Sequence, residues 1–159
     1  MSFVKNRVFP MENPPEQHED PDKLETLICI EALLDICYQA LRGLLNNETH
    51  RQECLRYEEC VQEHQKELRK LFPLSKERET AIASKVYQYL LQLKSPHLFL
   101  RAVINLAMSL TAYKTDIYKE FCATDREHRE LLSIFLQDSM EEMKYLRREM
   151  EFHQNAHVV

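Results

Sequence analysis

Glycine and proline are scarce in most of this chain, and this scarcity constrains the fold more than any other feature. The sequence has one glycine, and four of its six prolines lie within residues 1–21. Few residues remain that favour tight turns, which disfavours an all-β fold with its many short connections. Leu, Glu, Lys, Gln, Arg and Met dominate, and all six form helices readily. The sequence therefore predicts an all-α protein, and its 159 residues are enough for one domain with a hydrophobic core.

One apolar segment carries carboxylates near its middle. The segment LETLICIEALLDICYQALRG covers residues 24–43 and is apolar around most of a helix circumference, yet it contains Glu31 and Asp35. Burying a charge without a partner is costly. Each carboxylate must therefore be exposed, neutralised, hydrogen-bonded or bound to a metal ion.

The charge distribution limits the classes of partner. The formal net charge is -5, and basic residues alternate with acidic ones instead of forming a long basic stretch. We therefore expect no nucleic-acid partner. No apolar run approaches the ~18 residues of a membrane-spanning helix. The first residues lack the apolar core of a signal peptide, so we expect a cytoplasmic protein without a membrane partner.

The cysteines show no pattern of a disulfide framework or a zinc site. Their number is odd, no pair has the C-x-x-C spacing, and most occupy apolar helical positions. We expect reduced thiols that pack as small hydrophobic side chains. They are Cys29, Cys37, Cys54, Cys60 and Cys122.

The chain divides into an arm, a helical domain and a tail. Residues 1–21 are rich in proline and acids, which predicts a flexible arm. We expect residues 22–153 to form a helical bundle domain and residues 154–159 to form a tail. Helices are expected at about 22–45, 48–72, 76–94, 96–123 and 125–153. Capping residues are expected at Asn47, at Ser75, at Ser95 followed by Pro96, and at Thr124 or Asp125.

Two of these helices have apolar faces that recur in steps of three and four residues, which is typical of helices that pack side by side. The first face consists of Cys54, Tyr57, Val61, His64, Leu68 and Leu71; the second consists of Leu132, Phe135, Leu136, Ser139, Met143, Leu146 and Met150. Short links predict two antiparallel hairpins. The helix between them could span ~30 Å, and we expect it to return the chain to the end of the bundle where the first hairpin begins.

The two halves of the chain repeat one pattern. EALLDICY at 31–38 corresponds to TAYKTDIY at 111–118, and each segment ends in a tyrosine. VQEHQKEL at 61–68 corresponds to EMKYLRRE at 142–149 at nearly the same offset. Two hairpins with the same internal spacing indicate an ancient duplication.

With these hairpins the sequence resembles the ferritin-like superfamily, and its rubrerythrin-like branch most, over about residues 24–153. Proteins of that family join two helix hairpins through a long crossover. Each hairpin supplies a Glu from its first helix and a Glu-x-x-His from its second to a di-iron centre. The resemblance therefore implies a ferritin-like four-helix bundle of two hairpins joined by a crossover helix.

The ligand set that the resemblance implies is incomplete. Glu31, His64 and Glu142 match ligand positions, whereas Val61, Thr111 and Tyr145 stand at the other three. A di-iron centre needs most of its carboxylates and both imidazoles. We therefore expect no working di-iron site, no resident cofactor, and none of the family's oxidase, peroxidase or iron-storage activities.

Three interpretations of the remaining residues stay open. Glu31, His64 and Glu142, with Asp138 one turn earlier, form a vestigial buried cluster in which His64 pairs with Glu31. Alternatively, Glu31 faces water in a gap between helices. In the third interpretation Glu31, His64 and Glu142 bind a single ion, iron or another divalent metal, as one imidazole and two carboxylates.

Other reactive side chains give no recognisable site. His50, His97, His128, His153 and His157 lie near helix ends or in polar stretches, and we expect surface or capping roles for them. No Ser-His-Asp order or nucleophile elbow occurs, and Gly43 is alone, so no catalytic or cofactor-binding residue is assigned. The tyrosines Tyr87, Tyr89, Tyr113, Tyr118 and Tyr145 are expected to serve core and interface packing.

Three functions follow. The favoured one is a non-catalytic bundle that acts as an interaction or structural module. Its expected partner is another protein or a second copy of the chain, which would make a homodimer. The second is a metal-binding oxidoreductase or iron-handling protein. The third is a helical adaptor unrelated to ferritins, with a groove for an amphipathic helix; a simple up-down-up-down helix order would favour it.

Overall fold

The computed structural model contains five helices in the residues it describes, 21–93 and 99–155. They are α1 (Pro21–Leu44), α2 (Glu48–Leu71), α3 (Lys76–Leu93), α4 (Leu100–Thr124) and α5 (Arg129–Asn155). No strand occurs in these two ranges, which confirms the all-α prediction. The expected arm, apart from Pro21, and the expected Ser95 cap with Pro96 lie outside the described residues, as do His97 and His157.

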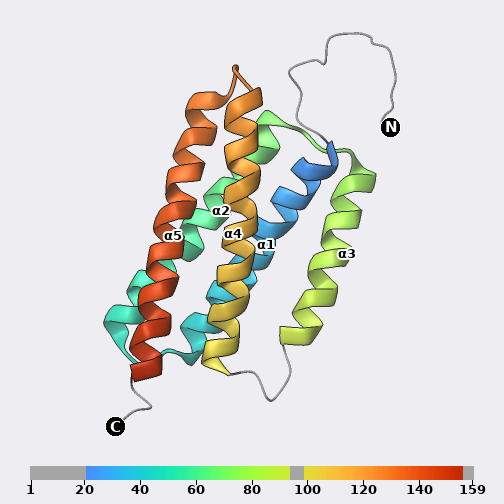
Figure 1. The fold of residues 1–159 in the computed structure, drawn as a ribbon. Helices are drawn as coiled ribbons and strands as arrows, with labels where there is room; N and C mark the ends of the chain where they lie inside the picture. The colour runs from blue at the N-terminus through green and yellow to red at the C-terminus, as the bar shows by residue number, and fades with distance from the viewer. Residues whose placement is uncertain (1–20, 94–98, 156–159) are drawn as a thin grey trace, which may run out of the picture.

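The helices form two antiparallel hairpins, α1 with α2 and α4 with α5, and α3 lies along the outside of α1 (Figure 1). Helix α1 contacts α2, α3 and α4, and α2 faces α5 through side chains such as the stacked rings of Tyr57 and Tyr145. A helix that is apolar on most sides loses its exposed apolar surface by taking this central position.

The direction of α3 corrects one expectation. Helix α3 runs in the same direction as α1, so α4 begins at the opposite end of the molecule from the start of α1 (Figure 1). We expected both hairpins to begin at the same end. An antiparallel hairpin returns the chain to its starting end, and a crossover of bundle length then carries it to the far end.

Side-chain caps define several helix ends. Asn47 Oδ1 accepts a hydrogen bond from the backbone N–H of His50 at 3.1 Å, and Ser75 Oγ accepts one from Arg78 at 3.2 Å. Asp125 Oδ1 accepts from the N–H of His128 at 2.9 Å. The first two bonds pair N–H groups in the first turn of a helix, which have no partner within the helix, and they confirm the predicted caps at Asn47 and Ser75. Because α5 begins at Arg129, the Asp125 bond closes the turn ahead of that helix and does not cap it.

Three boundaries differ from the expected ones. Helix α5 begins at Arg129, later than the expected start at about 125. The backbone of Phe99 is extended (φ -104°, ψ 148°), and α4 begins at Leu100, later than the expected start at Pro96. Helix α5 continues to Asn155, two residues beyond the expected end of the bundle domain at His153. 

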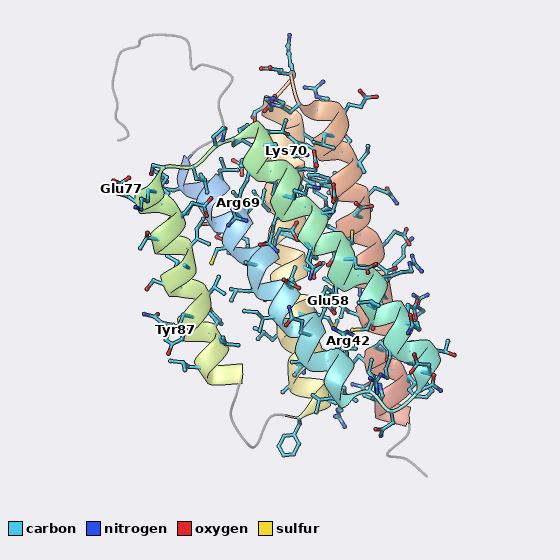
Figure 2. All side chains as sticks on the ribbon, turned by 180° about the vertical axis from the view of Figure 1, so that it is seen from behind. Arg42, Glu58, Arg69, Lys70, Glu77 and Tyr87 are labelled. Atoms are coloured by element: carbon cyan, nitrogen blue, oxygen red, sulfur yellow. The ribbon has the colours of Figure 1, made fainter. Side chains whose placement is uncertain are left out.

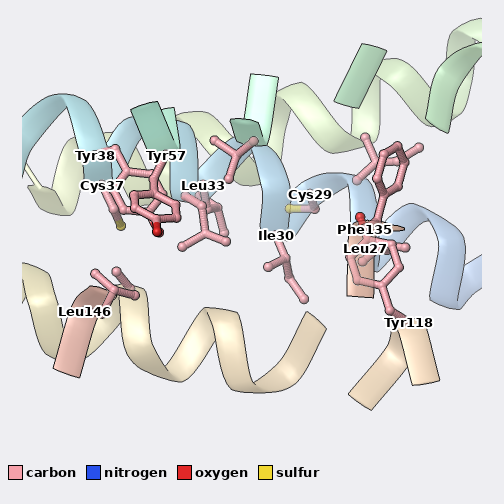
Figure 3. Packing of buried hydrophobic residues seen from close by; sticks show 14 of the residues in the cluster. Leu27, Cys29, Ile30, Leu33, Cys37, Tyr38, Tyr57, Tyr118, Phe135 and Leu146 are labelled. Atoms are coloured by element: carbon pink, nitrogen blue, oxygen red, sulfur yellow. The ribbon is translucent and has the colours of Figure 1, made fainter. Parts of the chain in front are cut away.

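The core lies between α1 and the helices around it. Figure 3 shows Leu27, Ile30 and Leu33 of α1 in this core together with Tyr57 and Phe135 from α2 and α5. Full burial of a side chain of this size contributes about 1.5–3 kcal/mol to stability. The two predicted apolar faces point into this core, and only Leu71, Leu136 and Met143 among their members are half-buried.

Ion pairs join the helices at the surface. Arg42 of α1 and Glu58 of α2 face each other across the first hairpin (Figure 2), and Arg42 Nε donates to Glu58 Oε1 at 2.9 Å. No described helix is both long and apolar enough to cross a membrane. All five cysteines have free thiols, as expected. Of the five tyrosines expected to pack, Tyr118 and Tyr145 are buried, whereas Tyr87, Tyr89 and Tyr113 are exposed.

Candidate functional site

Four fully buried ionisable side chains meet between the two hairpins. They are Glu31 of α1, His64 of α2, Lys114 of α4 and Glu142 of α5, and none is more than 1% exposed. We call these four residues the central cluster. Apolar residues of the same helices surround it, so the interactions within it act in a medium of low dielectric constant.

The ammonium group of Lys114 lies at the middle of the central cluster. Lys114 Nζ donates to Glu31 Oε1 at 2.8 Å and to Glu142 Oε1 at 2.5 Å. One cation therefore bridges a carboxylate from each hairpin. This ion pair neutralises the carboxylate in the middle of α1. Asp35, the other acid of that segment, is half-buried and accepts hydrogen bonds from Gln39 and Gln62.

The imidazole of His64 connects the cluster to the surface. Its Nδ1 lies 2.8 Å from Glu31 Oε2, and its Nε2 lies 2.9 Å from Asp138 Oδ2 and 3.5 Å from Cys60 Sγ. The Asp138 side chain is 36% exposed. Together with Cys60 it lines a surface depression of about 280 Å³. The polar chain therefore runs from water through Asp138 and His64 to the buried Glu31.

Two tyrosines complete the cluster in a reciprocal way. The Tyr38 hydroxyl on α1 donates to Glu142 Oε2 at 2.8 Å, and the Tyr118 hydroxyl on α4 donates to Glu31 Oε2 at 2.5 Å. Each hairpin thus supplies a hydroxyl to the buried carboxylate of the other. These tyrosines occupy matching positions of the internal repeat, the eighth residues of 31–38 and 111–118.

The ionisation of the two bases follows from their partners. Burial lowers the pKa of His64, but Glu31 and the hydrogen bond with Asp138 outweigh it and hold the pKa well above its usual value. Burial also lowers the pKa of Lys114, and Glu142 and Glu31 together raise it above its usual value. Both bases are therefore cationic at neutral pH.

The two acids have shifts of opposite sign. Burial raises the pKa of Glu31, but Lys114 and His64 outweigh it, so the pKa lies below its usual value. Burial raises the pKa of Glu142 above its usual value, because Lys114 offsets burial only in part and Glu31 repels a second negative charge. The difference arises because Glu31 is hydrogen-bonded to two cationic side chains, Lys114 and His64, and Glu142 to Lys114 alone among the two.

The central cluster does not fit the di-iron centre that the resemblance implies. An ammonium group lies between the two carboxylates that a metal would bridge, and Val61, Thr111 and Tyr145 offer no strong ligand in place of the missing ones. The hydroxyl groups of Thr111 and Tyr145 have no hydrogen-bond partner of ordinary geometry. The Tyr145 hydroxyl contacts the Cys54 thiol, a weak partner.

The structure brings the predicted residues together. Glu31, His64 and Glu142 share the central cluster, and Asp138 joins it as expected. They do not converge on one point, because Lys114 separates Glu31 from Glu142. Among the described residues near this cluster, one group of three has metal-binding donor atoms within 4.8 Å of one another. It consists of Cys60, His64 and Glu142 and does not include Glu31.

Lys114 is the residue that sequence reasoning missed. A signal for it exists in the periodicity of residues 100–124. Thr111, Lys114 and Tyr118 follow one another in steps of three and four, and that spacing places the lysine on the buried face of the helix. A lysine at such a position requires an acidic partner.

The fold and the cluster together define a class: an all-helical protein whose two hairpins are joined by a buried ion-pair network. Comparison of the chain with protein-family models, with curated proteins and with solved structures finds no match. 

Proposed function

We propose that this chain is a ferritin-like bundle without a catalytic metal centre, and that it serves as an interaction or structural module. The observation that carries the proposal is the position of Lys114 Nζ between Glu31 and Glu142. A buried lysine at this place supplies the positive charge that a metal ion would otherwise supply to the two carboxylates. The cluster then stabilises the bundle and has no open position for a substrate.

The protonation states support a metal-independent role. A metal ion in the cluster would require an unprotonated His64 and displacement of the Lys114 ammonium. The pKa of each base lies above its usual value, because the buried acids stabilise the protonated forms. Metal binding would therefore have to remove protons that the cluster holds firmly.

The helix order supports a relationship with ferritin-like proteins over an unrelated adaptor. Helix α3 lies between the two hairpins in the sequence and along α1 in space (Figure 1). The two hairpins contribute matching groups to one cluster, including Tyr38 and Tyr118. Among α1, α2, α4 and α5, the third helix, α4, runs in the same direction as α2 (Figure 1), whereas in a simple up-down-up-down bundle the third helix runs in the same direction as the first.

The outer surface near α3 supports an interaction role, with a second copy of the chain as the proposed partner. Tyr87 and Leu91 of α3 and Tyr113 of α4 are each more than half exposed. Tyr113 also lines a groove of about 250 Å³ between α1, α3 and α4. Exposed aromatic and aliphatic side chains of this size are typical of protein interfaces.

A second candidate function is metal binding at the central cluster, in an oxidoreductase or an iron-handling protein. The observation that favours it is the convergence of donor atoms from Cys60, His64 and Glu142 within 4.8 Å. Imidazole and carboxylate are ordinary ligands of iron and other divalent ions. This function would require that Lys114 move away from Glu142.

Metal content separates the two candidates. The full-length protein is purified without chelator, loaded anaerobically with Fe²⁺, and compared with His64→Ala by elemental analysis. The proposal predicts that the iron content does not depend on His64. Iron in the wild type at about one equivalent that is absent from His64→Ala would overturn it and establish the second candidate.

A further inference from the structure

A second group of metal-binding side chains lies at the end of the molecule where α2 begins and α5 ends. His50 is in the first turn of α2, and Glu149 and His153 are one turn apart near the end of α5. We expected surface or capping roles for His50 and His153. Instead, both imidazoles are half-buried and face the same carboxylate.

The three side chains are close enough to share a ligand. His50 Nδ1 lies 2.8 Å from Glu149 Oε2, and His153 Nε2 lies 3.1 Å from Glu149 Oε1. The donor atoms of all three lie within 4.8 Å of one another. Phe152 packs against the His50 ring, with 4.5 Å between the ring centroids, and restricts the orientation of that imidazole.

Glu149 carries a buried carboxylate, which needs a neutralising positive charge nearby. Its side chain is 2% exposed, and its hydrogen bonds within the described ranges go only to these two imidazoles. No lysine or arginine of these ranges forms an ion pair with it. A buried carboxylate is stable when a charge of opposite sign neutralises it, and a divalent ion would do so while using both neutral imidazoles as ligands.

The two separations between the imidazoles and Glu149 need little adjustment to hold such an ion, and the two imidazole nitrogens already lie within 4.8 Å of each other. Ligands about 2.0–2.1 Å from a tetrahedral zinc ion lie about 3.4 Å apart. The hydrogen-bonded separations of 2.8 Å and 3.1 Å would therefore open by a few tenths of an ångström. The His50 and His153 side chains are 23% and 17% exposed, so water can reach the site and occupy the remaining position.

We propose that His50, Glu149 and His153 form a binding site for a divalent transition-metal ion such as Zn²⁺, with two imidazoles, one carboxylate and water as ligands. Two imidazoles with a carboxylate are an ordinary ligand set for first-row ions of this kind. The bound ion links the start of α2 to the end of α5, in addition to the contacts that these helices make through Tyr57 with Tyr145 and through His64 with Asp138. It therefore joins the two hairpins at one end of the molecule.

The test uses the full-length protein without an affinity tag, stripped with EDTA and dialysed. Zn²⁺ is titrated by calorimetry, and Co²⁺ is added in parallel because tetrahedral Co²⁺ absorbs visible light. We expect one equivalent of Zn²⁺ to bind. His50→Gln and His153→Gln keep a hydrogen-bond donor but lose the imidazole. Each should weaken Zn²⁺ binding by more than about 100-fold, which exceeds the loss expected when a residue only supports a metal ligand and does not bind the ion itself.

Two further variants localise the ion. His128→Gln removes an imidazole that is 2.9 Å from Asp125, and it should leave Zn²⁺ binding unchanged. His64→Gln, in the central cluster, should also leave it unchanged. Circular dichroism of each variant in EDTA establishes that it is folded before the titration.

The outcomes are distinct. Absence of Zn²⁺ binding at one equivalent would mean that the three residues form only a hydrogen-bonded triad, and it would overturn the proposal. Binding that survives both His50→Gln and His153→Gln would do the same. Loss of Zn²⁺ in His64→Gln alone would place the ion in the central cluster and would contradict the proposed metal-independent function as well.

Discussion

The Lys114 ammonium on α4 lies 2.8 Å from Glu31 Oε1 on α1, although 83 residues separate the two in the sequence. This ion pair explains how a carboxylate is accommodated in the middle of an apolar helix. It also joins the two hairpins at the centre of the core. The cost of burying both charges is offset only while each keeps its partners.

Lys114→Met should therefore strongly destabilise the protein. The substitution leaves Glu31 and Glu142 buried without their shared cation, and loss of one member of a buried ion pair costs about 3–5 kcal/mol. Urea unfolding at neutral pH measures the free energy of unfolding. Lys119→Met, at an exposed position of the same helix, is the matched control and should change it by less than about 0.5 kcal/mol. Equal effects of the two substitutions would contradict the bridging role of Lys114.

Tyr118→Phe should destabilise the protein more than Tyr145→Phe does. Tyr118 donates a hydrogen bond to the ionised Glu31, and a bond to a charged group contributes about 1.5–3 kcal/mol. The buried Tyr145 hydroxyl contacts the Cys54 thiol, a weak partner, so its removal should cost less than about 1 kcal/mol. Both variants delete one oxygen atom from a buried ring, and thermal and urea unfolding compare them directly. A larger loss for Tyr145→Phe would show that the Tyr118 bond is not a main stabilising contact.

The stability of the protein should decline as the pH rises above about 6.5, in part through His64. Its pKa is raised in the folded state because Glu31 and Asp138 outweigh burial. A base of this kind stabilises the fold fully below its unfolded-state pKa, and that contribution is lost as the pH rises through the folded-state pKa. One such group gives a limiting slope of about 1.4 kcal/mol per pH unit.

The variant His64→Gln tests this origin of the pH dependence. Urea unfolding of the wild type and of His64→Gln is measured at several pH values from about 6 to 9. The variant should be less stable at the acidic end of the range, and its slope should be smaller by up to about 1.4 kcal/mol per pH unit. Parallel curves for the two proteins would show that His64 carries no excess proton in the folded state.

Self-association through the surface near α3 should be sensitive to charge. Tyr87→Lys combined with Leu91→Lys places two positive charges at side chains that are 59% and 55% exposed. In sedimentation velocity the wild type should form dimers and the double variant should be monomeric, because a dimer with twofold symmetry would bring each new charge into the interface twice. Ile134→Lys, at a 52% exposed position on α5, is the control and should leave the dimer intact. A wild type that remains monomeric at all concentrations would contradict the proposed partner.

The helices and their buried faces were accessible from the sequence, because they depend on local patterns. The spacing of Cys54, Val61 and Leu68 predicted the buried face of α2, and Asn47 and Ser75 marked helix starts through their capping side chains. These inferences need only the period of a helix and its capping pattern. The gathering of Glu31, His64 and Glu142 was expected only from the resemblance to ferritin-like proteins.

The partners within the core were not accessible in the same way. Lys114 and Glu142 are 28 residues apart, and Tyr38 and Glu142 are 104 residues apart. Contacts at such separations depend on the rotation and axial register of each helix against its neighbours, and a residue's position in its own helix does not specify these. Local periodicity therefore accounts for five helices with a carboxylate buried in the first. The packing of α1, α2, α4 and α5 places Lys114 as the cation beside that carboxylate, a partner that the local patterns did not predict.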